Sequence, residues 1–507
     1  MYDTNFLGQK IRQASLGRED ANFLTVHPTG ARVSYGSFFA NAERIAAALV
    51  ATGVKPGDRV AVQAAKTVTM LELYVGTVLA GAVFLPLNPG YTAFEVSYFL
   101  GDAAPALLVC DPANLEELTP IAINSDVATI WTLASDESGS LPQVRDAQTA
   151  GFVAVDRAPN DLAAILYTSG TTGRSKGAML THLALASNSE TLRDYWRFTQ
   201  QDVLIHALPI FHTHGLFVAT NITLMAGAQA IFIAGFDVEA TLDYMPQATA
   251  LMGVPTFYTR LLGLIGLAEA AKNMRLFISG SAPLLAETHV QWHATTGHAI
   301  LERYGMTETN MNTSNPYLGD RRAGTVGFPL PGVEVIVTDP ETGTILPQGE
   351  VGVLEVRGPN VFAGYWNMPE KTAEELRKNG FFITGDIAQI DRDGYVSIVG
   401  RAKDLIISGG YNIYPKEIEL LIDDLDCVLE SAVIGVPHPD FGEASVAVIV
   451  RHADGKLDET GVKNAIAPQL AKFKQPKKIL FLDELPRNAM GKVQKNLLRQ
   501  RFATLFA

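Results

Sequence analysis

The sequence predicts an α/β protein with two domains of unequal size. Short apolar runs of strand length alternate with longer helix-like runs through most of the chain, as in parallel sheets covered by helices. The 507 residues exceed what a single hydrophobic core usually holds. We therefore expect a large N-terminal domain over residues 1–402, with parallel or mixed sheets covered by helices. A small, mobile α+β lid domain should follow over residues 403–507.

Three elements in the first part illustrate the alternation. Arg59–Gln63 has the pattern of a strand, an apolar helix should run from about Thr69 to Ala80, and Gly81–Leu87 should return as a second strand. A strand, a helix and a strand in this order predict parallel pairing. Farther along, the apolar run Leu162–Tyr167 is suited to a buried strand.

The boundary between the domains is expected at Arg401–Asp404. Before it, the turn signal Asp391-Arg392-Asp393-Gly394 joins Thr384–Ile390 and Tyr395–Val399 into a predicted hairpin. After it, the pattern predicts a lid made of one helix and two strands, at Ile418–Ile422, Ser431–Val436 and Ala444–Val450.

Composition excludes several classes of protein. The chain is 47% hydrophobic and 18% charged, as globular proteins are, and its net charge of −13 argues against nucleic acid as a partner. With only Cys110 and Cys427, no disulfide framework is expected, and a cytoplasmic location is the default. The first residues lack the pattern of a signal peptide. The uncharged stretch Val203–Phe236 is interrupted by Pro209 and by histidines, so we expect no membrane span.

The loop Tyr167–Gly177 has the composition of a phosphate-binding segment. It contains five Ser or Thr hydroxyls and three glycines around Lys176. Glycines let backbone N–H groups approach a polyphosphate, and the lysine supplies a positive charge. The spacing is not that of a Walker A loop, because no Ser or Thr follows Lys176. Composition alone would also suit an ordinary surface loop.

Four further motifs follow this loop in a defined order: Tyr304-Gly305-Met306-Thr307-Glu308, Thr384-Gly385-Asp386, Gly400–Asp404 and Pro486–Lys492. Together with the loop they resemble the adenylate-forming superfamily, which includes acyl-CoA synthetases, peptide-synthetase adenylation domains and luciferase-like enzymes. The resemblance covers nearly the whole chain. It implies ATP-dependent activation of a carboxylic acid as an acyl-adenylate, release of pyrophosphate, and transfer of the acyl group to the thiol of CoA.

The resemblance also implies roles for individual residues. Lys492 is the expected adenylation lysine, His212 the residue that gates the carboxylate, and Thr307 and Glu308 further catalytic residues. Glu308, with Thr168, should bind Mg²⁺, which favours oxygen ligands. Asp386 and Arg401 should hold the ribose. The residues expected around the rest of ATP or AMP are Thr168, Ser169, Gly170, Thr171, Thr172, Gly173, Lys176, Gly280, Ser281, Ala282, Arg303, Tyr304, Gly305, Met306, Thr307 and Lys492.

The acid is expected to carry a second carboxylate. Arg303 directly precedes Tyr304, and Arg260 closes a segment that lies beside the acyl pocket in the family. An arginine with help from Ser279 and His212 would suit a small dicarboxylic acid, and Met306 should line the same pocket. Either arginine could instead form a structural ion pair or point into solvent. The stretches Leu204–Phe217, Arg275–Leu284 and Glu302–Tyr317 resemble malonate-activating members of the family, so malonate is expected, with methylmalonate as a secondary substrate.

The second half-reaction requires a thiol to reach the same centre. By resemblance, Lys403 marks the hinge about which the lid turns, and CoA should contact Gly409, Gly410, Tyr411 and Lys472. Residues 472–501 hold nine Lys or Arg against two acids, which suits either a solvated face or a patch for the phosphates of ATP and CoA. Lys492 is also a candidate target of a lysine acetyltransferase and deacetylase.

Alternatives to the predicted function are a ligase for another short or aromatic acid, a carrier-dependent adenylation module, and a luciferase-type oxygenase. The carrier-dependent alternative is weakened, because no carrier-protein Ser motif or second module fits after Ala507.

Overall fold

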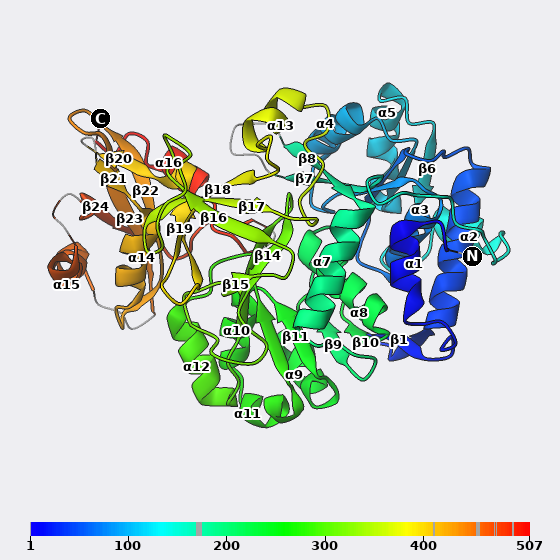
Figure 1. The fold of residues 1–507 in the computed structure, drawn as a ribbon, viewed down its shortest axis with the longest axis horizontal. Coiled ribbons are helices and arrows are strands. Elements are labelled where there is room, and N and C mark those ends of the chain that lie inside the picture. Colours follow the sequence, from blue (N-terminus) through cyan, green and yellow to red (C-terminus); the bar gives the residue numbers. More distant parts are fainter. Residues whose placement is uncertain are drawn as a thin grey trace.

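The computed structural model describes residues 2–168, 175–408, 411–452, 457–470, 472, 474–488 and 491–506. A large body built from several sheets contains the N-terminus, and a smaller body at the opposite end contains the C-terminus (Figure 1). The mixed α/β fold with a large first part and a small last part confirms the predicted fold class.

The first central sheet has six strands in the order β6-β5-β3-β4-β7-β8. All neighbours are parallel except β7 and β8, which form an antiparallel pair. The pair β7–β8 therefore carries the phosphate-loop motif between its strands. The bounds are β3 Arg59–Gln63, β4 Val83–Pro86, β5 Leu107–Cys110, β6 Thr129–Thr132, β7 Leu162–Thr168 and β8 Lys176–Thr181.

The second central sheet has nine strands in the order β15-β14-β13-β12-β11-β9-β10-β1-β2. Its centre, from β13 to β1, is parallel, and antiparallel strands lie at both edges. The bounds are β1 Asn22–Val26, β2 Ala31–Ser34, β9 Val203–His206, β10 Gln229–Phe232, β11 Ala250–Gly253, β12 Leu276–Ser279, β13 Leu301–Met306, β14 Asn310–Ser314 and β15 Phe328–Pro329.

Two smaller sheets complete the chain. An antiparallel sheet β16-β17-β18-β19 contains the predicted hairpin as β18 and β19, and the last sheet joins β21-β20-β23-β22 with β24 beside β23. The bounds are β16 Glu334–Thr338, β17 Val351–Arg357, β18 Phe382–Ile390, β19 Val396–Arg401, β20 Ile406–Ser408, β21 Tyr411–Ile413, β22 Val428–His438, β23 Gly442–Arg451 and β24 Lys478–Phe481.

Helices cover the sheets, and several begin at side-chain caps. Thr67 caps α3, and Thr92 forms a capping box with Glu95 at α4, so unpaired N–H groups of the first turns are satisfied. The bounds are α1 Phe6–Gln13, α2 Tyr35–Ala51, α3 Val68–Leu79, α4 Ala93–Ala103, α5 Leu115–Asn124, α6 Ser140–Asp146, α7 His182–Tyr195, α8 Asn221–Ala226, α9 Val238–Tyr244, α10 Pro255–Leu262, α11 Leu267–Ala270, α12 Ala286–Thr296, α13 Pro369–Glu375, α14 Pro415–Asp423, α15 Glu459–Ile466 and α16 Lys495–Arg501.

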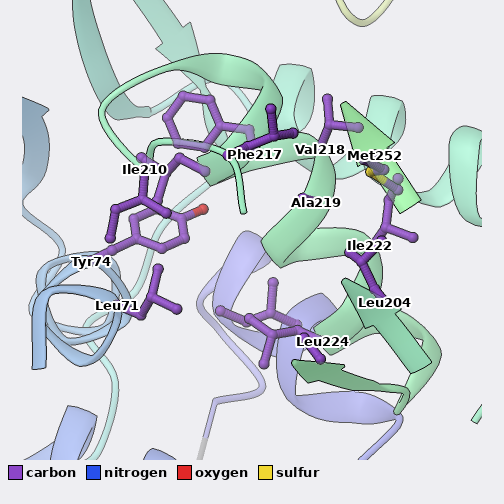
Figure 2. Packing of buried hydrophobic residues seen from close by; sticks show 14 of the residues in the cluster. Leu71, Tyr74, Leu204, Ile210, Phe217, Val218, Ala219, Ile222, Leu224 and Met252 are labelled. Carbon is purple, nitrogen blue, oxygen red and sulfur yellow. The ribbon is translucent and has the colours of Figure 1, made fainter. Parts of the chain in front are cut away.

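The uncharged stretch supplies two strands of the nine-stranded sheet and the buried helical segment that joins them. It contains β9, a π-helix over His214–Thr220, α8 and β10. Figure 2 shows the apolar side chains of this stretch packed against Leu71 and Tyr74 of α3. The hydroxyl of Tyr74 lies 3.2 Å from Asn221 Oδ1. A π-helix often marks a functional segment, since it widens one turn of backbone. Among the described residues, no helix has the length and apolar character that crossing a bilayer requires.

The predicted elements match the observed ones closely. β3 has the predicted bounds, α3 begins one residue before the predicted Thr69, and β4 is shorter than the predicted run. In the last part, α14, β22 and β23 contain the predicted helix and strands and extend beyond them. The extensions follow from cross-strand pairing of β22 with β23 over most of their length, which single-strand periodicity does not reveal. The domain boundary after residue 402 stays a prediction.

Candidate active site

The candidate site lies where parallel strands of the nine-stranded sheet end. Strands β9, β11 and β12 end at His206, Gly253 and Ser279, and β13 carries the Tyr304–Glu308 motif past the same edge. Open α/β sheets bind ligands outside the carboxyl ends of their strands. The fold thus gathers motifs that are far apart in the sequence.

Arg303 is buried, and no carboxylate of the described residues forms an ion pair with it. It is 2% exposed, and its Nε and Nη2 have no hydrogen-bond partner among the described residues. Burial lowers the pKa of its guanidinium to about 9, although Tyr258 and Glu302 oppose this. Gly280 makes room for the guanidinium, because a Cβ at that position would lie 2.4 Å from Arg303 Cζ. A buried guanidinium with unused donors is suited to an anionic ligand.

Other unsatisfied polar atoms belong to residues beside Arg303 in the fold. Ser279 Oγ and His214 Nε2 are buried and without a partner among the described residues. His214 Nδ1 lies 3.3 Å from the hydroxyl of Ser281. Ser281 has φ +71°, which is unusual for a residue other than glycine and is common at functional sites. No role for His214 was predicted from the sequence, although it lies two residues after His212.

His212 lies two residues before the π-helix and is half-buried. Burial lowers the pKa of its imidazole to about 4, so the ring is neutral at physiological pH. Its carbonyl accepts a hydrogen bond from the Leu216 N–H at 2.9 Å, which fixes the backbone of the segment. A neutral imidazole at this place could donate a hydrogen bond to a carboxylate or shape the pocket wall.

Arg260 is placed differently from Arg303. It lies in the last turn of α10 and is exposed. An exposed guanidinium remains hydrated, so it discriminates between acids less strongly than the buried one. The structure therefore singles out Arg303 of the two, and a substrate contact by Arg260 stays a prediction.

The predicted ribose residues form a tight charged group. Arg401 Nε lies 2.6 Å from Asp386 Oδ1, and the hydroxyl of Tyr304 donates to Asp386 Oδ2. Burial, followed by the Asp386 charge, raises the pKa of Tyr304, so its hydroxyl remains protonated. In the same motif, Gly305 is required because a Cβ there would lie 1.9 Å from the carbonyl oxygen of Asn310. Asp386 is therefore held in one orientation by both neighbours.

The predicted metal and phosphate residues are joined by two residues that sequence reasoning missed. Glu308 is 5% exposed, and its Oε1 lies 3.1 Å from the hydroxyl oxygen of Tyr365. The same hydroxyl lies 2.6 Å from Glu375 Oε2, and Lys176 Nζ lies 3.3 Å from Glu375 Oε1. Burial raises the pKa of Glu308. No motif in the sequence pointed to Tyr365 or Glu375, because α13 approaches β8 only in the folded chain.

The remaining residues predicted to bind ATP, Mg²⁺ or the acid show few specific contacts or are not described. Thr168 ends β7, and its hydroxyl lies 3.4 Å from the carbonyl oxygen of Lys176. Thr307, Met306 and Ala282 are half-buried along the edge of the site. The predicted phosphate contacts Ser169, Gly170, Thr171, Thr172 and Gly173 lie outside the described residues.

Next to Lys492, Gly491 lies close to α10. A Cβ on Gly491 would lie 3.6 Å from Thr256 Oγ1, at the start of α10. The Lys492 N–H donates to Asn488 Oδ1 at 2.9 Å, which shapes the turn. Much of the Lys492 side chain is accessible to solvent, but protein atoms surround its ammonium. This crowding, followed by the charge of Arg401, lowers its pKa from 10.5 to about 8.

The predicted CoA contacts are only partly described. Gly409 and Gly410 lie outside the described residues, Tyr411 begins β21, and Lys472 is exposed. Lys403 lies in the short helical turn after β19, and its neighbour Asp404 pairs with Arg499 at 2.6 Å. The basic stretch is largely neutralised by ion pairs that join Lys474 to Glu417, Lys478 to Glu459, Arg487 to Glu430, Lys495 to Glu419 and Arg499 to Asp404. These pairs favour a structural role for much of that stretch.

Comparison with known proteins identifies the family. Residues 12–366 match the AMP-binding enzyme family, and residues 417–492 match the AMP-binding enzyme C-terminal domain. The chain therefore belongs to the AMP-binding enzyme family, as the motifs predict. A malonate–CoA ligase of Arabidopsis thaliana is 35% identical, over 88% of this chain and 78% of the relative. A feruloyl-CoA synthase of an Amycolatopsis species is also 35% identical, over 93% of this chain and 94% of the relative.

Solved structures extend the similarity to the whole fold. ATP-bound MatB from Rhodopseudomonas palustris is 57% identical, with a TM-score of 0.97 over 99% of this chain and 100% of that chain. The apo form of the same protein, with the same coverage, has a TM-score of 0.86. The backbone described here is thus closer to the ATP-bound form. A benzoate–CoA ligase of Burkholderia xenovorans LB400 is 28% identical, with a TM-score of 0.88.

Proposed function

We propose that this enzyme is a malonyl-CoA synthetase, which converts malonate, ATP and CoA into malonyl-CoA, AMP and pyrophosphate. The observation that carries the proposal is the buried guanidinium of Arg303, whose Nε and Nη2 find no partner in the described protein. A monocarboxylic acid would leave these donors unsatisfied, whereas the second carboxylate of malonate would pair with them. The similarity to malonate–CoA ligases supports the same substrate.

The first half-reaction forms malonyl-adenylate. A carboxylate oxygen of malonate attacks the α-phosphorus of ATP, and the bond from that phosphorus to the bridging oxygen of pyrophosphate breaks. Lys492 would place its positive charge where negative charge concentrates during this step. Asp386 would accept hydrogen bonds from the ribose hydroxyls in the orientation that Arg401 and Tyr304 impose. Lys176 and the loop before it would hold the departing phosphates.

Mg²⁺ fits this site through a single carboxylate. No group of three or more His, Cys, Asp or Glu residues in the described part of the chain could hold a metal ion by itself. Mg²⁺ usually binds one or two carboxylates together with substrate phosphates and water. The buried carboxylate of Glu308 suits this arrangement, with the hydroxyl of Thr168 as a further oxygen. When bound, the ion would neutralise charge on the phosphate oxygens.

The second half-reaction transfers the malonyl group from AMP to CoA. The thiolate of CoA attacks the acyl carbon, and the bond to the phosphate oxygen of AMP breaks. Since Lys492 and its loop lie against α10 in this arrangement, we propose that the last domain turns about Lys403 to admit the thiol. Gly409, Gly410, Tyr411 and Lys472 are the proposed CoA contacts.

The test is pyrophosphate release by the purified protein with ATP and Mg²⁺, with and without CoA, across malonate, methylmalonate, succinate, acetate, butyrate, octanoate and 4-coumarate. CoA-dependent turnover that strongly prefers malonate is expected. Turnover that prefers an uncharged acid would overturn the dicarboxylate assignment and favour the runner-up, a ligase for another short or aromatic acid. Independence from free CoA would favour a carrier-dependent module.

Acetylation of Lys492 is a separate regulatory proposal. Solvent exposure of the Lys492 side chain supports access by a modifying enzyme, although protein atoms surround its ammonium in the arrangement described here. Acetylation removes the charge, so adenylate formation should fall while thioester formation from supplied malonyl-adenylate survives. Mass spectrometry of the protein from its native cells, with both half-reactions assayed, would test this. Normal adenylate formation by fully acetylated protein would contradict it.

A further inference from the structure

Glu375 stands opposite the phosphate-loop lysine. It is the last residue of α13, whereas Lys176 is the first residue of β8. The lysine ammonium lies 3.3 and 3.4 Å from the two carboxylate oxygens, so it bridges both. The side chains of Lys176 and Glu375 are 14% and 22% exposed. This pair is therefore shielded from solvent more than a surface ion pair.

Aromatic and hydroxyl contacts hold the pair in place. Lys176 Nζ lies 4.1 Å from the centre of the Tyr365 ring, a distance at which a cation is attracted to the ring face. The hydroxyl of the same tyrosine lies 2.6 Å from Glu375 Oε2. This hydrogen bond and the two lysines near Glu375 lower the pKa of its carboxyl despite partial burial, so the group stays charged.

We propose that Glu375 is a positioning residue that acts as an internal counter-anion for Lys176, holding it when no phosphate is present and competing with pyrophosphate for it. The inference rests on the proposed function, in which Lys176 contacts the departing phosphates. After pyrophosphate forms, return of the ammonium to Glu375 would weaken the hold on this product and speed its release.

The charge of Glu375 determines whether its removal strengthens or weakens the binding of pyrophosphate. A carboxylate within 3.5 Å of an ammonium offsets much of the attraction that the ammonium exerts on a second anion. Neutralising Glu375 should therefore strengthen the binding of pyrophosphate to Lys176. A simple loss of structure would weaken it, so the two explanations predict opposite changes.

The chain provides a matched control in the neighbouring Glu374. Lys371 Nζ contacts Glu374 at 2.8 Å and Glu375 at 3.0 Å, whereas the contacts to Lys176 and Tyr365 belong to Glu375. Glu374→Gln and Glu375→Gln remove the same charge from adjacent positions of one helix. A difference between them therefore reports the contact with Lys176 and Tyr365, and not the net charge of the protein.

The experiment measures inhibition of malonate- and CoA-dependent AMP formation by added pyrophosphate at fixed Mg²⁺. Glu375→Gln should lower the inhibition constant of pyrophosphate by roughly two- to fivefold, the range of a partly exposed ion pair. Glu374→Gln should change the inhibition constant much less, since the contacts to Lys176 and Tyr365 belong to Glu375. Equal inhibition constants for all three proteins would overturn the inference, as would weaker inhibition in Glu375→Gln.

Two further variants separate the inference from the function on which it rests. In a Lys176→Met background, Glu375→Gln should no longer change inhibition by pyrophosphate. If Lys176→Met alone leaves inhibition unchanged, Lys176 does not contact the phosphates, and the proposed role of the loop fails together with the inference. If Lys176→Met weakens inhibition but Glu375→Gln equals Glu374→Gln, only the inference fails.

Lys371→Met gives a test that does not alter Glu375 itself. This lysine is 33% exposed and shares Glu375 Oε1 with Lys176. Its removal should leave Glu375 free to hold Lys176 more strongly, so inhibition by pyrophosphate should weaken, in the opposite direction to Glu375→Gln. Stronger inhibition in Lys371→Met would contradict the competition. Thermal unfolding of each variant checks that the fold is retained.

Discussion

Strand β13 separates two charged regions that differ in their internal pairing. On the acid side, Arg303 is buried with two nitrogens that have no partner among the described residues. On the nucleotide side, Asp386 is bound by Arg401 and Tyr304, and Lys176 is bound by Glu375. The two regions meet at β13, where Arg303 and Tyr304 are neighbours, yet their charged groups differ in pairing.

The difference indicates how each region recognises its ligand. A buried charge without a partner destabilises the free enzyme and strongly favours the one ligand that supplies the missing charge. In a paired region the charged groups are already oriented by protein partners. A ligand must replace one of those partners, so the region contributes less to discrimination between substrates. We expect the acid side to decide which substrate is used and the nucleotide side to decide how well ATP is positioned.

The largest effect is expected from Lys492→Ala, since the proposed role of this lysine is to place its charge between the acid and the α-phosphate during adenylation. Loss of a preorganised charge should lower malonate-dependent pyrophosphate release by about 100- to 1,000-fold. Thioester formation from supplied malonyl-adenylate should be nearly unchanged. An equal loss in both half-reactions would show that the variant damages the fold and not the adenylation step.

The acid side is tested by Arg303→Met with Arg260→Met as the matched control. Loss of a charged hydrogen bond of 1.5–3 kcal/mol should lower kcat/KM for malonate by about 10- to 150-fold. Activity with butyrate should be retained or rise, because the methionine leaves no unpaired charge. Arg260→Met should change malonate use little, since Arg260 is exposed. The reverse ranking of the two variants would move the second carboxylate to Arg260.

The pH dependence of adenylation tests the environment of Lys492. Its pKa lies near 8, so the charged form dominates below pH 8 and is lost as the pH rises through that value. Single-turnover adenylation should therefore fall about tenfold per pH unit above pH 8. Lys492→Arg keeps its charge and should lack this alkaline decline, at whatever rate it retains. An alkaline decline that persists in Lys492→Arg would assign the titration to another group.

The smallest effect is expected on the paired side, from Tyr304→Phe. The variant keeps the ring and removes the hydroxyl that donates to Asp386, while Arg401 still orients this carboxylate. A typical hydrogen bond contributes about 0.5–1.5 kcal/mol net, and Arg401 keeps the Asp386 charge paired in the variant, so KM for ATP should rise by about two- to tenfold. The preference for malonate over butyrate should not change. A change in that preference would show that the two regions are coupled.

Sequence patterns predicted most of the architecture, because the periodicity of apolar residues and the turn signals that mark strands and helices are local in the sequence. β3, α3, β7 and the β18–β19 hairpin occur close to their predicted positions. The motif around Tyr304 was also recognised from its residues. The extension of β22 and β23 was not, since it depends on pairing between two strands.

The candidate site was predicted less completely. His214, Tyr365 and Glu375 were missed because each takes its place through contacts with residues distant in the chain. Arg303 and Arg260 were both predicted as contacts for the second carboxylate of the acid, because both lie beside family motifs in the sequence. Only burial separates them, with Arg303 enclosed beside Gly280 and Arg260 exposed on α10.

The sequence by itself determined the family, the order of the motifs and the chemistry that they suggest, because these depend on residue type and local spacing. The tertiary structure decided which charges are paired. Burial and long-range contacts leave Arg303 with unused donors and give Lys176 a carboxylate partner from α13. The free energy of an ionic group depends on its surroundings in space, and those surroundings arise only when distant segments pack together.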